Sequence, residues 1–301
     1  MAYRLRSCES VGNGVRRIAR EQIDKSVAEL TDSDIGRHVA VHQFRKRGKK
    51  IRGLIRLVRP ALGSVYKREN AWYRDAARGL SQVRDAEALL ETLDRIRDHF
   101  SEELDDDTFL DLRRRLQQRR RRMANDRLGL DETIDQLPAE LEAARRRIDD
   151  WQIDDAAFDA VHGGLIRTYR RACTSLSKVS EKPSDERWHE WRKRTKYHWY
   201  QMRLLTGVWK PVLKARTNEL KRLADLLGDD RDLAVFRKTI RDDASLRPER
   251  PEVIELMMGL MHSERKRLQQ DAEDLGRRVF AEPPKRFVRR IESYWSVWRR
   301  E

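Results

Sequence analysis

The sequence predicts an all-α protein, and three observations lead to that fold class. Arg, Leu, Ala, Glu and Lys dominate the composition, and these residues are strong helix formers. Only 14 Gly and 8 Pro interrupt the 301 residues, and no segment alternates apolar and polar side chains convincingly, as a half-buried strand does. Apolar residues instead recur at helical spacing along most of the chain.

This helical spacing places the expected elements in order along the chain. In the first half, the expected helices span Glu9–Leu30, Arg37–Val58, Lys67–Arg78, Gln82–His99, Asp106–Asn125 and Thr133–Asp149. In the second half, they span Asp155–Lys178, Asp185–Leu205, Lys214–Leu227, Arg231–Asp242, Glu252–Glu273 and Pro284–Arg299.

The two halves of the chain resemble each other at a constant offset. Residues 41–52 read VHQFRKRGKKIR and residues 188–199 read WHEWRKRTKYHW, which are 147 positions apart (189 minus 42 for the histidines). LSQVRD at 80–85 and LGDDRD at 227–232 repeat the same offset (231 minus 84). Two matches in register predict an internal duplication.

A duplication of this length predicts two similar helical bundles. The polar stretch Asp149–Asp155 divides the repeats, so we expect one bundle over residues 1–150 and another over residues 151–301. Related bundles of this kind pack together as one pseudo-symmetric unit.

The expected helix Arg37–Val58 concentrates positive charge on one face. At about 100° per residue, its basic side chains fall within an arc of roughly 80°. These are His42, Arg45, Lys49, Arg52 and Arg56. The opposite side carries Phe44, Ile51, Ile55 and Val58, which predicts a core-facing surface there. The basic stripe is roughly 21 Å long, a length that suits a chain of phosphates better than one phosphate ester.

The expected helix Asp185–Leu205 repeats this design. Its basic stripe consists of His189, Arg192, Lys196 and Arg203, and Trp191, Met202 and Leu205 form its apolar side. Cations at i,i+4 repel each other. A basic stripe without interleaved acidic side chains therefore favours the binding of an external anion. Arginine forks bind phosphate oxygens in bidentate fashion, and lysine adds a point charge.

The two stripe histidines allow two interpretations. His42 and His189 either contact a phosphate, which would favour the imidazolium form, or tie neighbouring helices together through their ring nitrogens. A zinc site at His38 and His42 is a third interpretation, but no Glu, Asp or Cys joins them on that face.

Other arginines are weaker candidates for the same site. Arg84 and Arg231 belong to the repeated Arg-Asp motif, where an ion pair with the adjacent aspartate and contact with an anion are equally reasonable. Further candidates at a slightly shifted offset are Arg17, Arg20, Arg167 and Arg170. The dense cluster Arg113–Arg122 follows an acidic segment and faces all round its helix, so we interpret it mainly as a solvated surface.

The overall composition restricts the kinds of partner. Lys and Arg outnumber Asp and Glu by 66 to 51, giving a net charge of +15 that attracts polyanions. No run of apolar residues is long enough for a signal peptide or a membrane span. Cys8 and Cys173 match no paired metal or redox spacing, which predicts a reduced, cytoplasmic setting. We expect no metal or cofactor and no membrane partner, and the oligomeric state stays open.

These motifs resemble those of the CHAD domain family, the conserved histidine α-helical domain, over essentially the whole chain. The residues that carry the resemblance are His42, Arg45, Lys49, Lys50, Arg52, Arg56, Arg84, Asp85, His189, Arg192, Lys193, Lys196, Leu227, Gly228 and Asp232. The resemblance implies two pseudo-symmetric four-helix bundles with a basic central groove or pore. It also implies binding of inorganic polyphosphate and targeting to polyphosphate granules.

The chain departs from the family pattern in its second half. Tyr197 and Trp199 stand where the family commonly has basic residues, so the second stripe is less cationic than the first. Family members are often fused to a CYTH triphosphatase domain, but this chain lacks the Glu-x-Glu-x-Lys signature of that domain. We therefore expect a binding protein and no catalysis.

Two other functions compete with polyphosphate binding. A nucleic-acid binder, of RNA for example, is compatible with the net charge, although no helix-turn-helix, zinc-finger or RNP-type motif is present. An enzyme acting on phosphoanhydrides would need a glycine-rich phosphate loop or a carboxylate cluster for magnesium, and the sequence has neither.

Overall fold

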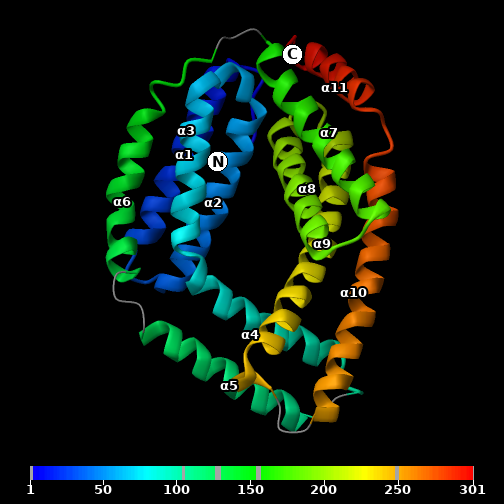
Figure 1. Cartoon of the computed structure of the whole chain (residues 1–301). Coiled ribbons are helices and arrows are strands. Elements are labelled where there is room, and N and C mark those ends of the chain that lie inside the picture. Colours follow the sequence, from blue (N-terminus) through cyan, green and yellow to red (C-terminus); the bar gives the residue numbers. More distant parts are fainter. Residues whose placement is uncertain (1–2, 104–105, 126–129, 154–156, 248–250, 301) are drawn as a thin grey trace.

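The computed structural model confirms the all-α prediction (Figure 1). It describes residues 3–103, 106–125, 130–153, 157–247 and 251–300, and for residues 81–85, 106, 108, 123–125, 130, 131 and 251 it describes the backbone alone. The α-helices of the described residues are α1 (Val11–Thr31), α2 (Arg37–Leu57), α3 (Arg59–Gly79), α4 (Ser81–His99), α5 (Asp106–Asn125), α6 (Leu130–Arg147), α7 (Asp159–Glu181), α8 (Asp185–Leu205), α9 (Lys210–Asp242), α10 (Pro251–Val279) and α11 (Pro284–Trp298). A short 3-10 helix, η1 (Ala244–Leu246), follows α9.

The helices form two sides and a connecting end (Figure 1). On one side, α1 packs against α2 and α6, and α2 packs against α3. On the other side, α7 packs against α8 and α11, and α9 packs against α8 and α10. The two sides meet where α2 contacts α7 and α8, and α4 and α5 cross the lower end of the molecule to reach α9 and η1 (Figure 1).

Local sequence signals explain where the central helices begin. The Ser10 hydroxyl accepts a hydrogen bond from the Asn13 N–H and caps α1, and Ser184 caps α8 through the Arg187 N–H. Asp185 and Glu186 in the first turn of α8 complement the positive end of the helix dipole.

The predicted break between Leu227 and Arg231 is wrong, because α9 continues through it as one helix of 33 residues. A glycine inside a helix lowers its stability without ending it, and Gly228 lies buried there. Asp230, also in the expected loop, is buried and accepts hydrogen bonds from Arg265 Nε at 2.9 Å and Gln269 Nε2 at 2.8 Å. These bonds from α10 stabilise the continuous helix.

The start of α3 also differs from the expectation. The helix begins at Arg59, eight residues before the expected Lys67, and contains a kink at Gly63 with φ 51°. This φ lies in the left-handed region that glycine adopts without the cost of a Cβ clash. The kink joins a helical segment before Gly63 to a second one after it, and the sequence periodicity predicted only the second segment.

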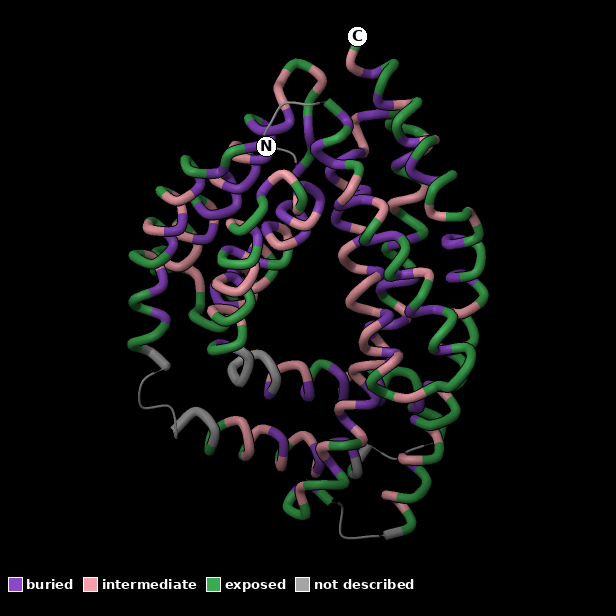
Figure 2. Tube along the Cα trace, turned by 45° about the horizontal axis from the view of Figure 1, so that its top comes forward, coloured by how far each residue is buried: buried purple, intermediate pink, exposed green. Residues whose placement is uncertain are grey.

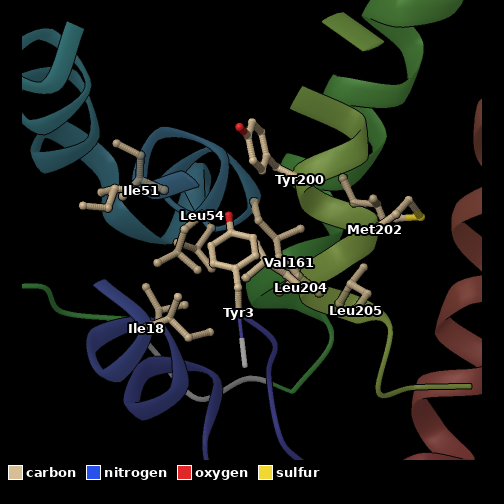
Figure 3. Close-up of a cluster of buried hydrophobic side chains, with 14 of the residues drawn as sticks. Tyr3, Ile18, Ile51, Leu54, Val161, Tyr200, Met202, Leu204 and Leu205 are labelled. Carbon is tan, nitrogen blue, oxygen red and sulfur yellow. The ribbon is translucent and has the colours of Figure 1, made fainter. Parts of the chain in front are cut away.

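The apolar faces predicted for α2 and α8 are confirmed. Phe44, Ile51 and Ile55 of α2 are buried, as are Trp191 and Met202 of α8. Figure 2 shows that buried positions recur along the helices on both sides of the molecule. These side chains of α2 and α8 belong to a large core that also takes residues from α1, α3, α6, α7 and α11. Figure 3 shows part of this core, in which Ile18, Leu54 and Leu204 surround the ring of Tyr3.

A second core lies at the connecting end of the molecule. It combines Leu93 of α4 and Leu112 of α5 with Phe236 of α9 and Met257 of α10. Both cores therefore contain residues from before and after residue 150. The division into bundles over 1–150 and 151–301 stays a prediction, and the two segments share their cores.

Candidate anion-binding site

The two helices with basic stripes cross each other directly. A Cβ at Gly53 of α2 would lie 2.7 Å from the Cβ of Tyr200 on α8, so the backbones approach too closely there for any residue but glycine. Gly53 and Tyr200 are 147 positions apart (200 minus 53). Residues that the predicted duplication makes equivalent thus face each other at the crossing.

The crossing has two flanks with related residue pairs. On one flank, the Arg56 guanidinium lies 3.9 Å from the centre of the Tyr197 ring. On the other flank, Lys50 and Arg203 lie against one ring, that of Tyr3. The offset of 147 relates Arg56 to Arg203 (203 minus 56) and Lys50 to Tyr197 (197 minus 50).

The first flank is an arginine cluster with almost no free space. A cavity of about 20 Å³ lies between α2, α3, α7 and α8. Its lining contains Arg56, Arg59, Arg167, Arg171 and Arg194 together with Tyr66, Thr168 and Tyr197, which we call the arginine cluster. Burial lowers the pKa of Arg56 to about 10. Arg56 also donates to Asn70 Oδ1 at 2.7 Å, so its guanidinium is held by neutral groups of the protein.

The second flank opens into a larger cleft. It has a volume of about 390 Å³ and lies between the amino-terminal segment, α1, α2, α8 and α9. Its lining consists of Tyr3, Arg4, Gln22, Lys25, Lys50, Arg203, Thr206, Lys214 and Thr217, and we call it the amino-terminal cleft. Burial, followed by the positive charge of Arg203, lowers the pKa of Lys50 to about 8.

The basic stripe of α8 faces α9. Burial, followed by the charge of Arg192, lowers the pKa of Lys196 to about 8, and burial lowers the pKa of Arg192 as well. His189 Nδ1 and Arg192 Nε are buried without a hydrogen-bond partner among the described residues. Asp232 on α9 lies near this stripe, but it already binds Arg95 Nη2 of α4 at 2.9 Å.

His189 also lines a large hollow of the described structure. This hollow has a volume of about 1280 Å³ and is shared by α8, α9 and η1. Its basic side chains include Lys193 and Arg231 from the predicted site, and it also contains acidic side chains such as Glu190, which binds Lys193 at 2.5 Å. Burial, followed by the charge of Arg231, lowers the pKa of His189 to about 4.

The first stripe is more dispersed than the second. His42 and Arg45 are half-buried on α2 and Lys49 is exposed. Arg52 Nε donates to Asn70 Oδ1 at 3.3 Å, the same oxygen that binds Arg56. Of this stripe, Arg56 shares a cavity lining with Arg194 and Tyr197 of α8.

Several weaker candidates lie apart from the stripes. Arg17 binds Glu9 and Glu21, and Arg20 binds Asp149, so carboxylates of the protein already engage both. Arg167 belongs to the arginine cluster, whereas Arg170 is exposed on α7. The side chain of Arg84 lies outside the described residues.

The structure adds basic residues that the sequence patterns missed. Arg59 and Arg171 join the arginine cluster, and Arg4, Lys25 and Lys214 join the amino-terminal cleft. Arg171 directly follows Arg170 in the sequence, but no periodic pattern links the others to the stripes. Only the packing of distant helices brings them together.

The described residues contain no group of three or more His, Cys, Asp or Glu side chains that could hold a metal ion. Within the same part of the chain, no helix combines the length and the apolar character that crossing a membrane requires.

Comparison with known proteins gives two findings and one negative result. The family model described as the CHAD domain matches residues 17–241. The solved structure of the CHAD domain from the plant Ricinus communis is similar in fold, with a TM-score of 0.63 at 15% sequence identity. The likeness covers 94% of this chain and 96% of the plant chain. No curated protein matches the sequence.

Proposed function

The chain belongs to the CHAD domain family, and from this premise we propose that it binds inorganic polyphosphate through the basic residues of α2 and α8 without catalysing a reaction. The proposal includes a location at polyphosphate granules. Inorganic polyphosphate is the ligand that the residue patterns and the family resemblance favour together.

The observation that carries the proposal is the incomplete bonding of the α8 stripe. His189 Nδ1 and Arg192 Nε are buried without partners among the described residues, and Lys196 beside them is desolvated. A buried polar group without a partner costs about 1–3 kcal/mol. A ligand that carries many anionic acceptor oxygens would satisfy these donors and neutralise the lysine, which offsets that cost.

The distribution of the cations favours a chain over a single phosphate. Lys193 and Arg231 line the hollow beside His189, and Arg192 and Lys196 follow His189 along α8. A flexible chain of phosphates contacts several such cations at once, and each contact releases counterions, so affinity should rise with chain length and fall with salt.

Isothermal titration with long-chain polyphosphate tests this function. We expect the double variant Arg192→Glu, Lys196→Glu to weaken binding at least about a hundredfold, because hydrogen bonds to charged groups contribute about 1.5–3 kcal/mol each. The control is Lys285→Glu, Arg286→Glu, which makes the same charge change at exposed positions of α11. It should change the affinity by less than about threefold.

Several outcomes would contradict the proposal. Equal losses in both double variants would mean that only net charge matters, and equal affinity for short and long chains would exclude a multi-contact site. RNA that polyphosphate fails to displace at matched phosphate concentration would favour nucleic-acid binding. Release of orthophosphate by the purified protein would contradict the non-catalytic part of the proposal.

The pH dependence of binding tests direct contact with His189. Its pKa is about 4 in the free protein, and an adjacent phosphate favours the imidazolium and raises that pKa. Affinity should therefore increase as pH falls through the raised pKa of the complex and level off below about 4. His189→Gln should lack this increase, and comparison of the two proteins cancels the titration of the ligand. Identical pH profiles would mean that His189 is structural.

A further inference from the structure

The amino-terminal cleft combines high positive charge with a small volume. Arg4, Lys25, Lys50, Arg203 and Lys214 line a space of about 390 Å³, and the lining contains no carboxylate. None of these cations forms an ion pair with a described residue. The nearby acids on α1 are engaged elsewhere, since Glu21 binds Arg17, Asp24 binds Arg145 and Glu29 binds Arg47.

The cleft is built by packing and is not a chance gathering of surface lysines. The buried Tyr3 hydroxyl donates to the Lys50 carbonyl oxygen at 2.7 Å, and the Leu5 N–H donates to the Leu204 carbonyl oxygen at 2.9 Å. These bonds fix the amino-terminal segment to α2 and α8. The Tyr3 ring lies 5.3 Å from the Arg203 guanidinium carbon and 5.8 Å from Lys50 Nζ, and this holds both cations at the cleft.

A buried amide also faces this space. Gln22 of α1 lines the cleft, is 2% exposed, and its Oε1 has no hydrogen-bond partner among the described residues. A half turn about its terminal bond presents the amide NH₂ instead, which donates to an anionic oxygen. Gln22 therefore supplies a neutral donor beside the cations.

We propose that the amino-terminal cleft is a separate binding site for a compact anion with two or three phosphate groups, distinct from the polyphosphate site proposed above. A terminal phosphate group carries about −1.5 to −2 charges near pH 7 and a bridging group about −1, so two or three linked groups together carry roughly −3 to −5 against the five cations of the lining. The volume lies near the lower end of the range for small-molecule pockets, about 300–1,000 Å³, which suits a short phosphate and not a long chain.

Lys50 is among the residues that carry the family resemblance, but most of the cleft lining is not. Tyr3 and Arg4 precede residues 17–241, the part of the chain that the family model matches. Lys25 of α1 and Lys214 of α9 belong to neither basic stripe. They provide variants that leave the residues of the proposed polyphosphate site unchanged.

Titration of the full chain with inorganic triphosphate tests the proposal. We expect the wild-type protein to bind one triphosphate and Lys25→Glu, Lys214→Glu to weaken that binding at least about a hundredfold. The control Lys67→Glu, Lys285→Glu makes the same charge change at exposed positions of α3 and α11 and should change it by less than about threefold. Lys25→Gln, Lys214→Gln repeats the test without introducing acids and should also weaken binding at least about tenfold. Circular dichroism verifies that each variant is folded.

Two results would overturn the cleft site. One is the absence of triphosphate binding at millimolar concentration in low salt, and the other is an equal loss in the cleft and control variants. Titrations with orthophosphate and myo-inositol hexakisphosphate show which number of phosphate groups binds best. Tighter binding of orthophosphate would contradict the inference that the five cations require two or three phosphate groups. Long-chain polyphosphate distinguishes the two proposals: if it binds the wild type and triphosphate does not, only the cleft site fails.

Discussion

The two flanks of the α2–α8 crossing differ in how closely the next helix approaches. At the arginine cluster, α7 packs tightly on α2, since a Cβ at Gly164 would lie 1.9 Å from the Leu57 carbonyl oxygen. Gly163 beside it faces Pro60. On the other flank, α1 is related to α7 at an offset of 150 (Arg167 minus Arg17), which makes Gly14 the counterpart of Gly164 (164 minus 150). A Cβ at Gly14 would lie 2.8 Å from Leu5 Cδ2, so the segment before α1 lies against this glycine, whereas the backbone of α2 lies against Gly164.

Backbone packing decides whether a cation at the crossing is enclosed by protein or faces open space. Where the glycines of α7 let the helices close, Arg56 lies on the Tyr197 ring and the free space is about 20 Å³. On the other flank, Arg17 turns to Glu9 and Glu21, and the amino-terminal segment occupies part of the gap. About 390 Å³ stays free there. Related positions thus yield a packed support on one flank and a ligand-sized space on the other.

Gly164→Ala should break the closed flank and have the largest effect. The added methyl group meets backbone, which a side-chain rotation cannot relieve, so we expect a loss of about 3 kcal/mol or more in the free energy of unfolding. Urea titration followed by circular dichroism measures the loss.

A second glycine provides the control for this substitution. Gly259 is exposed in α10, and a Cβ there meets nothing within 4 Å, so Gly259→Ala should stabilise the helix by about 0.5–1 kcal/mol. A Gly164→Ala protein as stable as the wild type would show that α7 does not hold this position, and the contrast between the flanks would fail.

The Arg56–Tyr197 pair should show the next largest effect. A desolvated cation over an aromatic ring contributes about 2 kcal/mol, and the Arg56 guanidinium is mostly buried at 3.9 Å from the ring centre. A double-mutant cycle with Arg56→Met and Tyr197→Leu measures the coupling. The same cycle for Arg203 and Trp199, 4.9 Å apart beside the open cleft, should give about 0.5–1 kcal/mol. Equal couplings would remove the energetic difference between the flanks.

Much of the helical framework follows from local patterns. The apolar faces of α2 and α8 have the periodicity of amphipathic helices, and their burial depends only on each helix finding a core. The repeated sequence indicated which helices are related, and the meeting of Gly53 with Tyr200 is consistent with that relation. Each of these patterns is contained in a segment of about 20 residues, so it can be recognised from the sequence alone.

The site depends more on contacts between distant segments. Tyr3 and Lys214 share a cleft although 211 positions separate them (214 minus 3), and no spacing rule relates the two. The break predicted in α9 was wrong because Asp230 receives hydrogen bonds from α10, a contact that local propensity does not contain. The charge patterns of the sequence identified the basic helices. Tertiary packing determines which of their cations form ion pairs with carboxylates of the protein.

Tyr3→Phe should have the smallest effect and test how the open flank is held. The substitution keeps the ring beneath Arg203 and removes the hydroxyl that donates to the Lys50 carbonyl oxygen, so the free energy of unfolding should fall by about 1 kcal/mol. Tyr169→Phe is the matched control, because Tyr169 makes the same kind of bond to the Glu282 carbonyl oxygen at 2.8 Å and does not line the cleft. Both variants should lose similar stability, but only Tyr3→Phe should increase hydrogen exchange at the Leu5 amide, whose bond to Leu204 anchors the segment. If Leu5 exchange stayed unchanged, the segment would be held by its apolar contacts alone, and the cleft would not depend on the tyrosine hydroxyl.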